Sequence, residues 1–127
     1  MNKVVASEDE VTRFIRPKEK RYVNQSGKLK TQAFSISEDG GISVFITTGM
    51  TEQKIWEHGD EHYANDKNII IGRGYFLADN VYKLNLQFDY DDEPPRHANI
   101  ISIPVDSDKN LSYRQYLAKH AKYQRRS

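Results

Sequence analysis

The chain contains no cysteine, which excludes disulfides, thiolate metal ligands and a cysteine nucleophile. Hydrophobic residues are also scarce, at 37% of 127 residues. No apolar run approaches the ~20 residues that a membrane helix needs, and the first residues lack the apolar core of a signal peptide. These absences predict a cytoplasmic protein without a membrane partner.

Charge is sorted along the chain, although the formal net charge is only +1. Residues 1–32 have a net charge of +4, residues 33–110 of −8 and residues 111–127 of +5. Such segregation indicates either a cationic surface for an anionic partner or basic ends that dock on the protein's own acidic body.

Alternation of apolar and polar residues marks the expected strands. It predicts a hairpin over 34–46 and a half-exposed strand over 82–90. The stretch 69–77 predicts another strand, with a bulge or tight bend at Gly72-Arg73-Gly74. The segment 98–103 predicts the last strand, which Pro104 closes.

Three short helices are expected, at the N-terminus, in the middle and at the C-terminus. Ser7 and Glu10 fit a capping box that begins the first helix, which Pro17 ends. Thr51 caps the second helix, and Gly59 is its natural end. The third covers about 109–124, with an apolar side toward the core and a cationic outer face.

These elements predict a single α+β domain over residues 1–127. Its sheet is expected to be mainly antiparallel, with about five strands and the helices packed on one face. Residues 17–30 are expected to form a basic, mobile loop, and residues 1–6 and 125–127 to be flexible.

Two histidines have the spacing of a zinc protease motif. His58-Gly59-Asp60-Glu61-His62 is an H-x-x-E-H string, in which both rings must lie one turn apart on a helix to bind one Zn²⁺. Gly59 is expected to break that helix, so a solvated loop is the favoured interpretation. His58 and His62 remain candidate metal ligands.

His97 is the candidate catalytic residue, because it opens a strand next to Arg96. A histidine and an arginine together suit acid–base chemistry on an anionic substrate, and Arg73 is the alternative cation. No Ser-His-Asp set stands out in the sequence, and a lone histidine is usually structural. Gly72-Arg73-Gly74 lacks the remainder of a phosphate-loop motif.

Basic residues at the two ends are the candidate binding residues, because they could neutralise phosphates. Tyr22 and Tyr123 lie among them and could stack on unpaired bases, which favours single strands over duplexes. The binding set is Lys18, Lys20, Arg21, Arg114, Lys119, Lys122, Arg125 and Arg126.

Three functions follow from these features. The favoured one is a non-enzymatic accessory module, without a cofactor, whose basic ends bind nucleic acid or an acidic protein. The second is a small hydrolase or transferase that acts on an anionic substrate through His97 with Arg96 or Arg73. The third is a structural subunit that associates with copies of itself.

Overall fold

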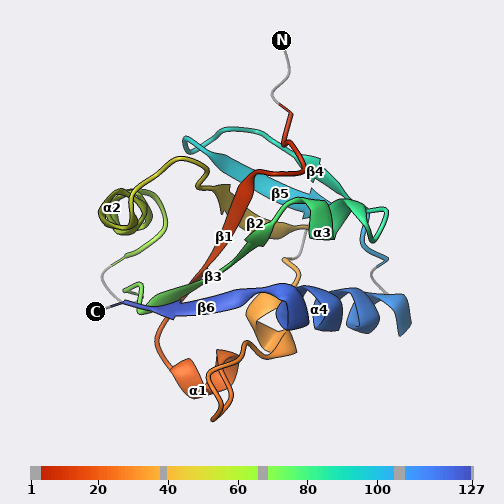
Figure 1. Ribbon diagram of the computed structural model, residues 1–127, viewed down its shortest axis with the longest axis horizontal. Helices are drawn as coiled ribbons and strands as arrows, with labels where there is room; N and C mark the ends of the chain where they lie inside the picture. The colour runs from red at the N-terminus through yellow and green to blue at the C-terminus, as the bar shows by residue number, and fades with distance from the viewer. Residues whose placement is uncertain (1–3, 38–39, 66–68, 105–107, 127) are drawn as a thin grey trace.

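The computed structural model describes residues 4–37, 40–65, 69–104 and 108–126. These residues form an α+β domain around one six-stranded sheet in the order β4-β5-β2-β1-β3-β6, in which all neighbours are antiparallel (Figure 1). The strands are β1 (Glu10–Ile15), β2 (Ile42–Ile46), β3 (Gly72–Leu77), β4 (Gln87–Asp89), β5 (His97–Ile101) and β6 (Lys122–Arg125). The predicted α+β class with a mainly antiparallel sheet is confirmed.

Helices lie on both faces of this sheet, not on one face as expected. They are α1 (Glu19–Tyr22), the 3₁₀ helix η1 (Thr31–Phe34), α2 (Glu52–His62), α3 (Asp79–Tyr82) and α4 (Asp108–His120). In Figure 1, α2 stands apart on one side of the sheet, while η1 and α4 lie on the other side. No helix among the described residues is long and apolar enough to cross a membrane.

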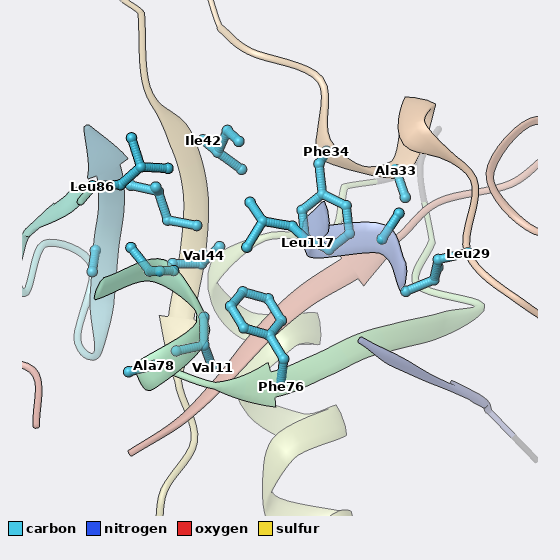
Figure 2. Close-up of a cluster of buried hydrophobic side chains, with 14 of the residues drawn as sticks. Val11, Leu29, Ala33, Phe34, Ile42, Val44, Phe76, Ala78, Leu86 and Leu117 are labelled. Atoms are coloured by element: carbon cyan, nitrogen blue, oxygen red, sulfur yellow. The ribbon is translucent and has the colours of Figure 1, made fainter. Parts of the chain in front are cut away.

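The larger core fills the face covered by η1, α3 and α4. Phe34, Phe76 and Leu117 meet there over the sheet residues Val11 and Val44 (Figure 2). The smaller core lies under α2, where Ile55 and Trp56 pack on Phe14 and Phe45. The two cores leave part of the α2 face open for polar residues.

The predicted N-terminal helix is wrong, because residues 10–15 form the strand β1. Val11 and Ile15 enter the larger core, while Phe14 enters the smaller one. A strand that is buried on both faces carries apolar residues without strict alternation. Their spacing at positions 11, 14 and 15 therefore imitates the periodicity of a helix.

The predicted hairpin and most of the predicted strand over 82–90 are also wrong. The strand β2 forms as expected, but its partners are β1 and β5. Of the expected first arm of the hairpin, Phe34 ends the helix η1, and residues 35–37 form no strand. Residues 79–82 form α3, and Asn85 has a left-handed φ of 61°. Only Gln87–Asp89 of the expected 82–90 strand is extended.

The segment expected to be a mobile loop contains the helical turn α1 and an antiparallel bridge between Val23 and Leu29. Both bridge residues are buried in the larger core. The chain also turns after α4, so residues 122–125 form the edge strand β6 and do not continue the predicted helix.

The expected bulge at Gly72-Arg73-Gly74 is absent from the described β3, which pairs without interruption with β1 from Gly72 to Leu77. A Cβ atom at Gly72 would lie 2.6 Å from the Tyr123 ring, and one at Gly74 would lie 2.5 Å from Leu29. The glycines therefore make room for side chains that cross the strand.

Candidate active site

Three side chains form a hydrogen-bonded chain at the edge of the α2 face. The Ser43 hydroxyl lies 2.7 Å from Nε2 of His97, and Nδ1 of the same ring lies 2.7 Å from a carboxylate oxygen of Asp91. This is the order of contacts in a serine nucleophile, its general base and the carboxylate that orients the base.

The carboxylate fixes the direction of both hydrogen bonds. An ionised Asp91 can only accept, so Nδ1 of His97 donates to it. In the neutral imidazole, Nε2 then carries no proton and accepts from the Ser43 hydroxyl. In this tautomer the imidazole is ready to take the serine proton.

The pairing of β2 with β5 brings the serine and histidine together. Ser43 lies opposite Asn99, and Phe45 lies opposite His97, so these side chains share one face of the sheet. The Phe45 ring packs edge-on to the imidazole, with the ring centroids 5.4 Å apart. The Asn99 side chain lies 3.4 Å from the second oxygen of Asp91.

The loop before β5 supplies the aspartate. It is closed by hydrogen bonds from the His97 amide to Pro94 and from the Asp92 amide to His97. The His97 side chain is 13% exposed and that of Asp91 is 34% exposed. Ser43 is partly exposed as well. The three residues therefore place a histidine that is held by a carboxylate next to a serine that solvent can reach.

The arginines proposed as partners of His97 lie elsewhere. Arg96 has a φ of 69° and donates to the Ile46 and Thr48 carbonyls, so it ties its loop to the end of β2. Arg73 is buried and contacts Glu10, Thr12 and Gln124. In the described part of the chain, neither guanidinium donates a hydrogen bond to His97.

His58 and His62 do lie on one helix, because α2 continues through Gly59, contrary to the expectation that it would break. Their ring centroids are 4.4 Å apart. Nε2 of His58 contacts the Pro95 carbonyl, and burial lowers the pKa of His58. No group of three potential metal ligands occurs among the described residues.

Several predicted binding residues at the C-terminus contact the protein itself. Arg114 donates to the Phe34 carbonyl, and Arg125 pairs with Glu19. Arg126 contacts both oxygens of Asp60, at 2.7 and 2.6 Å, which holds the pKa of that carboxyl below its ordinary value. Lys119 and Lys122 are exposed, as are Lys18, Lys20 and Arg21 at the other end.

Sequence reasoning selected His97 but missed Ser43 and Asp91. The signal at Ser43 is one polar residue in the apolar strand Ile-Ser-Val-Phe-Ile, which alternation alone explains as an exposed position. Asp91 lies in an acidic run that is typical of a solvated turn. Only the pairing of β2 with β5 joins them.

The chain matches no known family model, no curated protein and no solved structure. The function of this site is therefore inferred from its geometry.

Proposed function

We propose that the protein is a small serine hydrolase that cleaves an ester or a related acyl compound. The observation that carries the proposal is the hydrogen-bonded order Ser43–His97–Asp91, with 2.7 Å at each contact. The proposal keeps the predicted role of His97 in a hydrolase. In this proposal the residue that acts with His97 is Ser43, and not Arg96 or Arg73.

The reaction follows from the protonation states. The Ser43 oxygen attacks the acyl carbon while its proton passes to Nε2 of His97. The ester C–O bond then breaks, and His97 returns the proton to the leaving alcohol. Water attacks the acyl-enzyme with His97 again as base, which releases the carboxylic acid and restores Ser43.

Hydrolysis of a panel of 4-nitrophenyl esters tests the proposal. Ser43→Ala should lower kcat/KM by about 100-fold or more, because it removes the nucleophile. Ser112→Ala, at an exposed position on α4, is the matched control and should hydrolyse at the wild-type rate. Equal rates for Ser43→Ala and wild type, including no hydrolysis by either, would overturn the assignment.

A second candidate function, binding of an acidic partner, is supported by a groove of about 460 Å³ between the loop 24–32 and α4. Lys28, Lys30 and Lys119 line it together with amide side chains. No acidic residue of the described chain is among its lining residues. The groove supports binding of single-stranded nucleic acid better than Arg114, Arg125 and Arg126 do, because each of these arginines contacts the protein itself.

Fluorescence anisotropy with single-stranded RNA and DNA at ~50 and ~200 mM salt tests this candidate, because released counterions make such binding salt-dependent. Lys119→Gln should weaken binding and reduce the salt slope by about 1. Lys54→Gln, on the exposed side of α2, is the control. Absence of binding at low salt would contradict the candidate.

A further inference from the structure

A small cationic cavity lies where β1 separates from β2. The two strands pair at only two positions, Val11 with Ile46 and Thr12 with Phe45, before they diverge. The cavity there has a volume of about 140 Å³. Its lining residues with polar side chains are Arg13, Arg16, Tyr22, Ser35 and Tyr63, and no acidic residue of the described chain lines it.

Arg13 connects this cavity to the proposed nucleophile. Its guanidinium donates hydrogen bonds to the Ser43 carbonyl, at 2.6 Å, and to the Ala33 carbonyl of η1, at 3.1 Å. The guanidinium thus contacts the backbone of Ser43, although the Ser43 side chain does not line the cavity. Burial lowers the pKa of Arg13, and the positive charge of Arg16 acts in the same direction.

Arg16 is the less satisfied of the two cations. Its Nε is buried and has no hydrogen-bond partner. Its one hydrogen bond within the described chain is a long contact of 3.4 Å to the Tyr63 carbonyl, and its guanidinium stacks on the Tyr63 ring at 4.2 Å. A buried donor without a partner is costly, and an oxyanion would satisfy it.

We propose that this cavity binds a phosphate or carboxylate group, held by the Arg13 and Arg16 guanidinium groups. A cavity of this size has room for one small anionic group. As a statement about substrate, the inference rests on the proposed hydrolase and assigns it an acyl compound that carries such a group. Binding of the ion itself requires no catalysis.

Isothermal titration with inorganic phosphate and with acetate, at constant ionic strength, tests the site and separates the two oxyanions. Wild type should bind at least one of them, and Arg16→Gln should weaken that binding about tenfold or more, because a charged hydrogen-bond donor is lost. Arg21→Gln removes an exposed arginine outside the cavity and should bind as wild type does.

Failure of wild type to bind either ion, or equal binding by Arg16→Gln, would overturn the inference. Ser43→Ala keeps the cavity and should still bind the ion. If wild type binds the ion but hydrolyses no ester, the result counts against the proposed hydrolase and not against the anion site. In the opposite case, hydrolysis that is equal for neutral and carboxylate-bearing esters would remove the substrate assignment and leave the hydrolase in place.

Discussion

At the residue scale, both nitrogens of the His97 imidazole are hydrogen-bonded, and the arrangement favours proton transfer from Ser43 to Nε2. Asp91 holds Nδ1, and Ser43 lies at Nε2. Two partners with opposite hydrogen-bonding roles, one of them the hydroxyl of a partly exposed serine, point to a base that serves a nucleophile.

Replacement of Asp91 by asparagine should lower kcat on a 4-nitrophenyl ester by about 100-fold or more, because an amide can hold the imidazole in the wrong tautomer. KM should change far less, since Asp91 is not expected to contact substrate. Asp89→Asn changes an exposed acid nearby and supplies the control. An unchanged kcat for Asp91→Asn would remove Asp91 from the catalytic set.

His58 is a second histidine of interest, because its protonation should affect the stability of the fold. Its pKa lies below the ordinary value of 6.5, mainly because of burial. His58 therefore binds a proton more readily in the unfolded chain than in the folded one. As the pH falls from 6.5 toward the lower pKa of the folded state, unfolding becomes more favourable. This contribution to stability is complete above pH 6.5 and is lost as the pH falls.

Urea unfolding at pH 7 and pH 5 checks this sign. The free energy of unfolding should fall between the two pH values by a smaller amount in His58→Gln than in wild type, because one titrating group is gone. A fall of equal size in both proteins would show that His58 does not contribute.

At the scale of elements, β3 is shaped by its glycines. Leu29, from the bridge that follows α1, lies over Gly74, and Tyr123 of the edge strand β6 lies over Gly72. The two glycines thus allow the side chains of Leu29 and Tyr123 to pack directly on β3. Sequence reasoning saw the glycines but assigned them to a bulge, because the residues that cover them are distant in the chain.

Gly74→Ala should lower the free energy of unfolding by about 1–3 kcal/mol through overpacking. The added Cβ would lie 2.5 Å from the end of the Leu29 side chain. In the background of Leu29→Ala the same change should cost clearly less, which a double-mutant cycle by urea unfolding measures. Strictly additive effects would show that Leu29 is not the source of the clash.

At the scale of the whole molecule, the α+β class and the strands β2, β3 and β5 could be predicted from local patterns. The capped start of α2 at Thr51 could be predicted as well. The strand β1 could not, because burial on both faces hides its alternation. The site could not be assembled either, since Ser43 and His97 are 54 residues apart and meet only through the pairing of β2 with β5.

The charge pattern of the chain also acquires a physical meaning. Arg126 of the basic C-terminal segment binds Asp60 of the acidic middle segment, and its guanidinium lies 5.5 Å from the Trp56 ring. This contact supports the interpretation that the basic ends dock in part on the protein's own acidic segment. Self-association stays a prediction, which sedimentation of the full chain over a range of concentrations would check.

The central claim is that His97 activates Ser43, and covalent modification by a fluorophosphonate tests it most directly because it needs no knowledge of the substrate. Mass spectrometry should locate the phosphonyl group on Ser43 in wild type, and His97→Ala should slow the modification by about 100-fold or more. Labelling that is absent from Ser43 in wild type, or equally fast without His97, would contradict the account.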